Sequence, residues 1–330
     1  MPLHIARGSD GWDQTPCPGT RAPAHFRMLS IIICSRDPDR LQTVSESIRA
    51  TVGVEHEVIP VDNAEGRFGI CEAYNLGASR SRYPLLCFMH EDVVCHTQGW
   101  GLRVAEALAD PAAGLVGVVG GTYMGTSPSG YWIDGSRTNR IHQYQREADG
   151  QLTYKRINPG EQPFAEVVAV DGLWMCCRRD VWAQRPFDAA TFPGFHVYDL
   201  DFSFGVRALG LEVRVVYDVL LEHLSYGTYD RAWAEAQVAF ERKWRAALPA
   251  STRPLSAAER AEAESLCARS FAQTLLRSGF PRSVTTPYVL RGLRRHPFRR
   301  GNAWILRQAL LGQRLDARIK QLLGRRSAAT

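Results

Sequence analysis

Residues 83–93 read YPLLCFMHEDV, and this stretch decides the fold. The apolar run over 84–89 predicts a buried strand that ends abruptly in His90, Glu91 and Asp92. In open α/β sheets, ligands bind at the carboxyl ends of the strands. The stretch therefore predicts an α/β protein in which this strand delivers a metal-binding or acid–base cluster to the ligand-binding edge of the sheet.

The segments around this strand alternate between strand and helix patterns. Leu29–Cys34 is a continuous apolar and β-branched run, typical of a strand buried on both faces. Asp37 and Pro38 follow it with the residue types of a helix N-cap and first turn. Further strands are predicted over 57–61 and 115–120, and helices over 38–50, 70–80 and 99–109. This order predicts a Rossmann-like, mostly parallel central sheet with flanking helices.

The second half of the chain is less regular. Residues 121–165 are polar, aromatic and rich in glycine, and they predict an inserted hairpin or flap. Regular structure is expected to resume over 167–177. Strands are predicted over 212–217 and 219–222, a helix over 199–209, and helices again from about 228. The pattern divides the chain into a loose N-terminal arm (1–27), an α/β domain (28–227) and a helical, arginine-rich C-terminal extension (228–330).

The charge of the chain is concentrated near its C-terminus. The net charge is +6, whereas residues 277–330 carry thirteen basic residues against the single acid Asp316, so the first 276 residues sum to −6. A basic tail on an acidic body predicts contact with an anionic membrane surface or another polyanion. A solvated or self-packing tail is the alternative, and nucleic acid is the least favoured partner.

Composition also gives an expected location. The eight cysteines include no Cys-x-x-Cys pair, which indicates reduced, structural thiols in a reducing compartment. The sequence shows no signal-peptide pattern and no apolar run of the roughly 20 residues that a membrane span needs. We therefore expect a cytoplasmic protein, peripheral at the inner face of a membrane if the basic tail binds there.

Acidic and histidine side chains recur where the predicted strands end. Asp62 ends the second strand, Asp92 follows the third, and His223 ends a later one. Carboxylates bind Mg²⁺ and Mn²⁺, often with a histidine for Mn²⁺, and these ions typically bridge substrate phosphates. Asp199 and Asp201 open a predicted helix, where one of them fits a general base for a hydroxyl group. Helix capping and interaction with the helix dipole explain the same pair equally well.

Other nucleotide-binding and hydrolase patterns are missing. The glycines at 114, 117, 120 and 121 do not form Gly-x-Gly-x-x-Gly and do not follow the first strand, which argues against a nicotinamide site. The sequence contains no Walker A loop. It also lacks Gly-x-Ser-x-Gly, which argues against an α/β-hydrolase.

The order of the segments resembles the GT-A glycosyltransferases of the family 2-like, inverting group. The resemblance rests on residues 30–36 (SIIICSR), 61–63 (VDN), 74–77 (YNLG) through 90–92 (HED), and 170–178 with 194–207. These segments resemble, in turn, the nucleotide-binding turn, the strand end at the donor nucleoside, the Asn-x-Gly helix with its Asp-x-Asp strand end, and the acceptor loop with the helix that bears the catalytic base. The resemblance covers about residues 29–225, with a donor half over about 28–120 and an acceptor half over about 121–227.

The resemblance implies a metal-dependent, inverting transfer of a hexosyl group from a UDP-, GDP- or dTDP-linked sugar to a hydroxyl acceptor. Such a reaction belongs to the synthesis of a surface polysaccharide, glycan or glycolipid. It implies Asp199 as the catalytic base, Asp201 as a second acid, and Mn²⁺ or Mg²⁺ held by Asp92 and His223. Residues expected at the nucleotide-sugar are Ser35, Arg36, Asp62, Asn63, Asn75, His90 and Glu91, and residues expected at the acceptor are Gly172, Trp174 and His196. The segment 121–165 is expected to shape the acceptor site, whereas Trp132 and Trp174 fit a sugar-stacking role and a core position equally well.

The sequence departs from the family pattern at two positions. His90 stands where the first acid of Asp-x-Asp is usual, and Tyr198 precedes Asp199 where Glu-Asp is usual. The first departure leaves a non-catalytic GT-A-like binding or scaffold protein as one alternative. A sugar nucleotidyltransferase is the other, although residues 35–38 (SRDP) lack the glycine-rich basic loop that such enzymes carry after the first strand.

Overall fold

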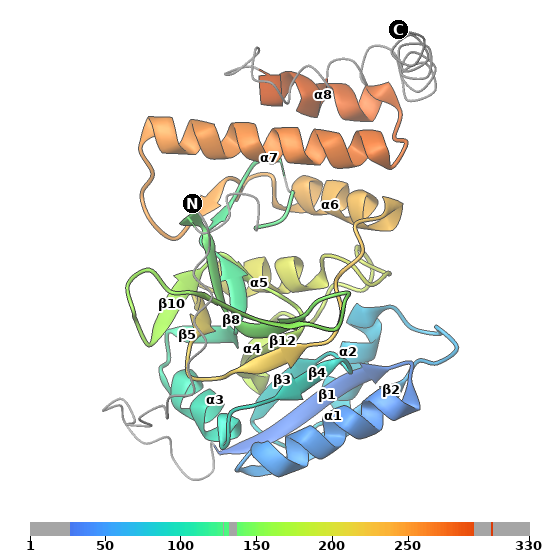
Figure 1. Cartoon of the computed structure of the whole chain (residues 1–330), viewed down its shortest axis with the longest axis vertical. Coiled ribbons are helices and arrows are strands. Elements are labelled where there is room, and N and C mark those ends of the chain that lie inside the picture. The colour runs from blue at the N-terminus through green and yellow to red at the C-terminus, as the bar shows by residue number, and fades with distance from the viewer. Residues whose placement is uncertain (1–26, 128, 132–136, 294–304, 306–330) are drawn as a thin grey trace, which may run out of the picture.

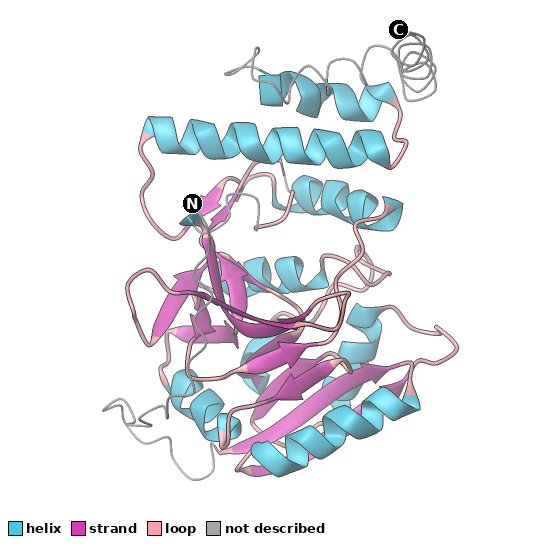
Figure 2. Ribbon diagram, viewed as in Figure 1, coloured by secondary structure: helices cyan, strands magenta, loops and turns pink. Residues whose placement is uncertain are grey.

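The computed structural model describes residues 27–127, 129–131, 137–293 and 305 (Figure 1). Nearly all of the expected N-terminal arm, Trp132 and most of the basic tail lie outside these residues. Within them the chain forms two main β-sheets, flanking helices and a C-terminal group of helices (Figure 2). The expected α/β class with a helical C-terminal part is confirmed.

The larger sheet has seven strands. Its order is β10 (Phe164–Val167), β13 (Glu212–Val216), β5 (Ala113–Gly117), β12 (Trp174–Arg178), β3 (Leu85–Met89), β1 (Met28–Ser35) and β2 (Glu55–Asp62). Strands β1, β2, β3, β5 and β13 point in one direction, whereas β12 and β10 run antiparallel to their neighbours. The sheet is therefore mostly parallel, as the sequence predicts. The antiparallel β12 between β3 and β5 is a feature that the sequence pattern did not reveal.

The first half of the chain follows its local sequence signals closely. Ile31, Ile32 and Ile33 of β1 are all fully buried, and because consecutive strand residues point to opposite faces, both faces of the sheet are covered there. Asp37 caps the next helix by accepting from the backbone N–H groups of Asp39 and Arg40, with proline in the first turn. The helices of the α/β part of the chain are α1 (Pro38–Thr51), α2 (Ile70–Arg80), α3 (Trp100–Ala109), α4 (Arg179–Gln184) and α5 (Tyr198–Ala208).

The smaller sheet contains the expected inserted hairpin. Its order is β11 (Ala169–Val170), β6 (Val119–Gly121), β8 (Asn139–Arg146), β14 (Leu221–His223) and β4 (Val93–Cys95), and β9 (Leu152–Ile157) pairs with β8. The strand expected over 115–120 is split between the two sheets, as β5 and β6. A Cβ atom on Gly117 would lie 2.8 Å from Val170 Cβ, and one on Gly120 would lie 2.5 Å from the Ala169 carbonyl oxygen. Glycine at both positions therefore permits the close crossing of the chains that the split requires.

The C-terminal helices form a layer of their own. Helices α6 (Arg231–Trp244), α7 (Ala257–Arg277) and α8 (Arg282–Leu293) stack at the end of the molecule opposite β1 and β2 (Figure 1). They share a hydrophobic cluster that includes Trp233, Phe271, Leu275 and Tyr288. The short pair β7 (Tyr123–Met124) and β15 (Ala250–Ser251) links this part to the rest of the chain. Among the described helices, none combines the length and the apolar character needed to cross a membrane.

Candidate active site

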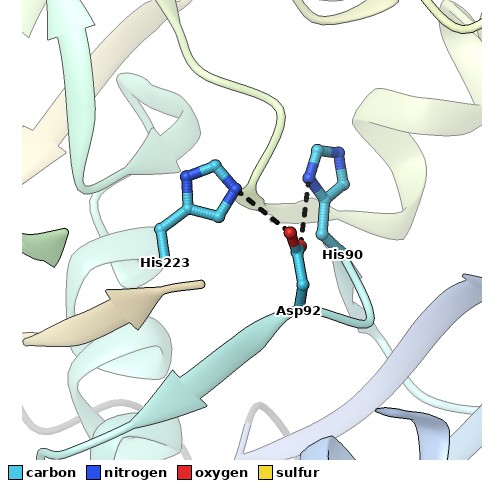
Figure 3. A group of neighbouring side chains, drawn as sticks. All are labelled: His90, Asp92 and His223. Atoms are coloured by element: carbon cyan, nitrogen blue, oxygen red, sulfur yellow. Dashed lines mark ion pairs between the residues drawn. The ribbon is translucent and has the colours of Figure 1, made fainter. Parts of the chain in front are cut away.

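Three side chains of metal-ligand type meet at the carboxyl end of β3. His90 and Asp92 follow this strand, and His223 ends β14 (Figure 3). The Nδ1 atom of His90 lies 3.8 Å from Asp92 Oδ1, and the Nε2 atom of His223 lies 3.6 Å from Asp92 Oδ2. One ligand atom of each residue lies within 4.8 Å of the other two, so the three side chains are close enough to hold one metal ion.

Pairing between remote strands assembles this cluster. His223 lies opposite Val93 in the antiparallel pair of β14 and β4, which places it beside Asp92. The Ser225 hydroxyl donates a hydrogen bond to Asp92 Oδ2 at 2.5 Å and orients the carboxylate. The structure thus brings together Asp92 and His223, the two residues expected to bind metal. It adds His90, which the sequence placed at the nucleotide.

The electrostatics of the cluster suit a cation. Burial lowers the pKa of His90, and the opposing charge of Asp92 only partly offsets this effect. Burial acts to raise the pKa of Asp92, but His90, His223 and the Ser225 hydroxyl together lower it below its usual value. A neutral imidazole and an ionised carboxylate are the protonation states in which these groups bind metals.

Tyr198 holds the ring of His90 in place. Its hydroxyl lies 2.5 Å from Nε2 of His90, while Nδ1 of the same ring is on the side of Asp92. Gly172 makes room for this hydroxyl, because a Cβ atom there would lie 2.0 Å from the Tyr198 oxygen. Tyr198 follows Val197, whose φ of 71° is rare for a β-branched residue and marks a strained turn. Gly172, which was expected at the acceptor, therefore leaves the space that the Tyr198 side chain occupies.

Asp199 and Asp171 form an acidic pair at the start of α5. Asp199 is a half-buried residue, and its carboxylate accepts a hydrogen bond from the Gly172 N–H at 3.1 Å. Burial, and then the charge of Asp171, raise the pKa of Asp199 to about 7. Asp171 accepts a hydrogen bond from the Tyr131 hydroxyl at 2.7 Å. The N-cap residue Val197 makes no side-chain hydrogen bond, and Asp199 lies in the first turn of α5, where a carboxylate also interacts favourably with the helix dipole. A carboxylate with this pKa suits proton transfer near neutral pH.

Asp201 belongs to a separate, structural network. Its buried carboxylate accepts from Lys243 Nζ at 2.9 Å and from Trp244 Nε1 at 2.7 Å. Lys243 also contacts Asp188 at 2.7 Å, so the network ties α6 to α5 and to the loop before it. Asp201 was expected as a second catalytic acid, and the structure places its carboxylate in this network. Residues two apart on a helix point in different directions, and α6 occupies the side to which Asp201 points.

The turn after β1 is shaped by Glu91. Its Oε2 atom accepts hydrogen bonds from the Ser35 hydroxyl at 2.8 Å, the Arg36 N–H at 2.9 Å and the Asp37 N–H at 3.2 Å. Ser35 is buried, whereas Arg36 is exposed. Of the three residues expected at the nucleotide here, Glu91 and Ser35 thus fix the turn, and Arg36 presents an exposed cation at the ligand-binding edge.

Asp62 and Asn63 play different parts at the end of β2. Asp62 lies opposite Ser35 in the parallel pair, and its side chain is 77% exposed. Asn63 is buried, and its side-chain amide both donates to and accepts from the backbone of Phe68 at 2.9 Å. Asp62 is therefore accessible to a ligand, whereas Asn63 closes the loop that follows it.

Asn75, expected at the nucleotide-sugar, and Trp174, expected at the acceptor or in the core, both make their contacts within the fold. The Oδ1 atom of Asn75 accepts from Trp182 Nε1 and from the Phe187 N–H, both at 3.0 Å, and its Nδ2 donates to the Phe187 carbonyl at 2.8 Å. The amide thus ties α2 to α4 and the following loop instead of facing a nucleotide. Trp174 is fully buried against Trp100, with ring centroids 5.9 Å apart, so it cannot stack on an acceptor sugar.

Two exposed aromatic side chains lie near the His90–Asp92–His223 cluster or the Asp171–Asp199 pair. Phe195 is 56% exposed, and its ring centroid lies 5.5 Å from that of His90. The Tyr229 side chain is 58% exposed. Partial burial of its hydroxyl, and then the negative charges of Asp171 and Asp199, raise the pKa of Tyr229. Neither residue was among the site residues expected from the sequence, although Phe195 lies in the segment 194–207 on which the family resemblance rests.

His196, expected at the acceptor, is half-buried beside the start of α6. Its Nε2 atom lies 3.5 Å from Asp230 Oδ1, and burial lowers its pKa. Asp230 also caps α6 by accepting from the Trp233 N–H at 2.9 Å. His196 therefore connects the loop before α5 with the start of α6.

Comparison with protein families assigns the chain to a class. The model of a family described as "Glycosyltransferase like family" matches residues 30–243, a span that is well over half of the 330 residues and includes every site residue described above. The chain belongs to this glycosyltransferase-like family. No curated protein sequence matched it.

Two solved structures illustrate the similarity in three dimensions. One is the crystal structure of GalNAc-T7 with UDP, GalNAc and Mn²⁺, with a TM-score of 0.45, 10% identity, and coverage of 79% of this chain and 52% of that chain. The chain thus spans about half the length of that protein. The other is the mannosyltransferase PcManGT from Pyrobaculum calidifontis in complex with GDP-Man and Mn²⁺. It has a TM-score of 0.45, 13% identity, and coverage of 91% of this chain and 88% of that chain.

Proposed function

We propose that this protein is a metal-dependent, inverting glycosyltransferase that moves a hexosyl group from a nucleotide-sugar to a hydroxyl acceptor. The observation that carries the proposal is the meeting of His90, Asp92 and His223 at the carboxyl end of β3, in a chain of the glycosyltransferase-like family. The partly exposed Asp199, with a pKa of about 7, supplies a candidate base at the start of α5.

The residues of the cluster fit a divalent cation. His90, Asp92 and His223 offer two imidazole nitrogens and a carboxylate oxygen, a set that favours Mn²⁺ over Mg²⁺ because histidine is a poorer ligand for the harder ion. The bound ion would neutralise the negative charge of the leaving diphosphate. Ser225 and Tyr198 would keep Asp92 and His90 in the orientation that binding requires.

The donor would lie along the adjoining edge of the sheet. Arg36 is an exposed cation in the turn after β1, and Asp62 is an exposed carboxylate at the end of β2. We assign Arg36 to the donor phosphates and Asp62 to the hydroxyl or amide groups of the nucleoside. Glu91 holds the turn between them and the metal cluster in a fixed shape.

Asp199 would act as the general base of a single displacement. It takes the proton of the acceptor hydroxyl while the acceptor oxygen forms its bond to the anomeric carbon and the bond to the diphosphate breaks. Attack from the side opposite the leaving group inverts the anomeric centre. Asp171 lies beside Asp199 and keeps the pKa of the base near the pH at which the reaction runs.

The acceptor would bind between the exposed aromatic rings. Phe195 and Tyr229 lie close to His90 and to the Asp171–Asp199 pair, and aromatic faces are good partners for the apolar faces of sugars. A glycan or glycolipid acceptor fits these surfaces. Replacing Phe195 by alanine should raise the KM for the acceptor and leave the KM for the donor unchanged, which steady-state kinetics would measure.

A membrane surface would give such an enzyme its acceptor. Residues 277–330 carry a net charge of +12, which favours an anionic leaflet. A protein held there from the cytoplasmic side would meet lipid-linked or surface glycans as they are built.

The first test of the function is nucleoside-diphosphate release from a panel of UDP-, GDP- and dTDP-sugars, with Mn²⁺, with Mg²⁺ or with EDTA. Slow hydrolysis of one donor that needs the metal and is lost in Asp92→Asn would support the proposal and identify the donor. Asp149→Asn, at an exposed turn of the β8–β9 hairpin, is the matched control and should keep full activity.

If no donor in the panel releases nucleoside diphosphate, donor binding would be measured by thermal shift. Binding without release would point to a need for the acceptor, which a glycolipid or oligosaccharide panel would then supply. An absence of both binding and release would contradict the proposal and favour a scaffold protein of the same family.

A further inference from the structure

A cavity lies between the β8–β9 hairpin and β10. Its volume is about 340 Å³, and its lining includes Arg140, Arg253, Asn158, Gln162, Thr252 and Phe164. The hydrogen bond from the Thr252 N–H to the Thr122 carbonyl, at 3.1 Å, fixes the segment that carries Arg253 against the wall formed by Thr122. The cavity is within the size range of sites for small polar molecules.

Among the described residues, Arg140 gives this cavity a positive charge that no carboxylate pairs with. Its Nη1 atom donates to the carbonyl oxygen of Asn139 at 2.7 Å, and within the described part of the chain no carboxylate lies at ion-pair distance from its guanidinium. The pKa of Arg140 is lowered chiefly by burial, and the positive charge of Arg253 adds to this. Two guanidinium groups of like charge in one cavity repel each other unless an anion lies between them.

The remaining charges of the cavity are balanced in pairs. Glu166 lines it but is paired with Arg207 at 3.2 Å, and Arg253 is itself paired with Glu259 at 2.9 Å. The charge left over is that of Arg140. An incoming anion would therefore meet a half-buried guanidinium with free donors and a second arginine beside it.

This cavity is separate from the candidate active site. Arg140 and Gln145 both lie on β8, and Gln145 is paired with His223. Five residues of strand span about 16 Å. The strand thus runs from the metal-type cluster at one end to the arginine-lined cavity at the other.

We propose that the cavity is an anion-binding site in which Arg140 and Arg253 hold the phosphate or carboxylate group of a molecule of about monosaccharide size. Asn158 and Gln162 also line the cavity. Asn158 uses both ends of its amide within the loop, and Gln162 uses its Nε2, which donates to the Gly160 carbonyl. A free effector anion and an acidic sugar unit share this chemistry. The proposal does not depend on glycosyl transfer.

The test measures ligand binding to the full chain in EDTA, so that no divalent cation can hold an anion at the His90–Asp92–His223 cluster. The probes for titration calorimetry are inorganic phosphate, glucose 6-phosphate, glucuronate and, as the uncharged control, glucose. We expect the three anions to bind and glucose not to bind. Arg140→Gln should weaken anion binding about tenfold or more, because a charged hydrogen-bond partner is lost.

Two variants keep the outcome clear. Arg253→Gln changes an exposed residue and should weaken binding even if Arg140→Gln fails to fold. Arg49→Gln, at an exposed arginine in the last turn of α1, should leave binding unchanged. Tighter binding of glucuronate or glucose 6-phosphate than of phosphate would identify a charged sugar as the ligand, and equal binding would identify a free anion. Equal binding of glucose, no anion binding, or equal losses in Arg49→Gln and Arg253→Gln would overturn the proposal.

Discussion

Replacing Gly172 by alanine should disturb the metal-type cluster without changing any of its members. The added Cβ atom would lie 2.0 Å from the hydroxyl oxygen of Tyr198 and 2.4 Å from its Cζ atom. Non-bonded contacts of this kind normally need about 3.5 Å, so the Tyr198 ring must move by roughly 1 Å or more. Its 2.5 Å contact with His90 Nε2 would then be lost, and the ring of His90 would be free to turn away from Asp92.

The magnitude follows from the role of such supporting contacts. Loss of a hydrogen-bonding partner behind a histidine ligand typically weakens metal binding about 10- to 100-fold. We expect Mn²⁺ binding to Gly172→Ala, measured by titration calorimetry, to weaken by that factor. Overpacking at this site should lower the free energy of unfolding by about 1–3 kcal/mol. Tyr198→Phe, which removes only the hydroxyl, should weaken Mn²⁺ binding to a similar extent at a smaller cost in stability.

Gly194→Ala is the matched control. Gly194 lies in the loop that leads to α5, and an added Cβ there meets nothing within 4 Å. This variant should bind Mn²⁺ like the unmodified protein. If Gly172→Ala is folded and also binds Mn²⁺ normally, the argument that Tyr198 positions His90 is refuted.

Four further outcomes are expected. Turnover should rise with pH through about 7, because Asp199 must be ionised to take a proton and burial and Asp171 raise its pKa to about 7; a flat pH profile would count against Asp199 as the base. The same raised pKa means that stability contributed by protonated Asp199 is lost as pH rises from the ordinary value of 3.8 towards about 7, so Asp199→Asn should gain stability relative to the unmodified protein over that range in urea unfolding. Asp201→Asn should lower the free energy of unfolding by about 2–3 kcal/mol, because Lys243 and Trp244 lose a charged partner; unchanged stability with lost turnover would return Asp201 to catalysis. Deleting residues 294–330, which carry a net charge of +9, should abolish salt-sensitive sedimentation with anionic vesicles, and unchanged binding would exclude the tail as the contact.

Local signals in the sequence were sufficient for most of the secondary structure. The apolar run of β1 and the Asp37–Pro38 start of α1 each depend on neighbouring residues only, and both appear in the structure as expected. The prediction of one strand over 115–120 was wrong, because the chain divides there into β5 and β6. This division depends on contacts of Gly117 and Gly120 with β11, which lies far along the chain. The antiparallel insertion of β12 beside β3 likewise depends on long-range pairing.

The sequence by itself determined which chemical groups stand at the ends of the strands, because backbone alternation and strand length follow from local residue types. It placed Asp92 after β3 and His223 at the end of β14, and the family pattern joined them. Only the tertiary structure decided which of these groups remain accessible to a ligand. The Asp201 carboxylate accepts hydrogen bonds from Lys243 and Trp244, and Trp174 is buried, whereas Asp199 is only half-buried. The reason is physical: a residue type fixes the donors and acceptors that a side chain offers, but partners from remote elements decide which of them are used.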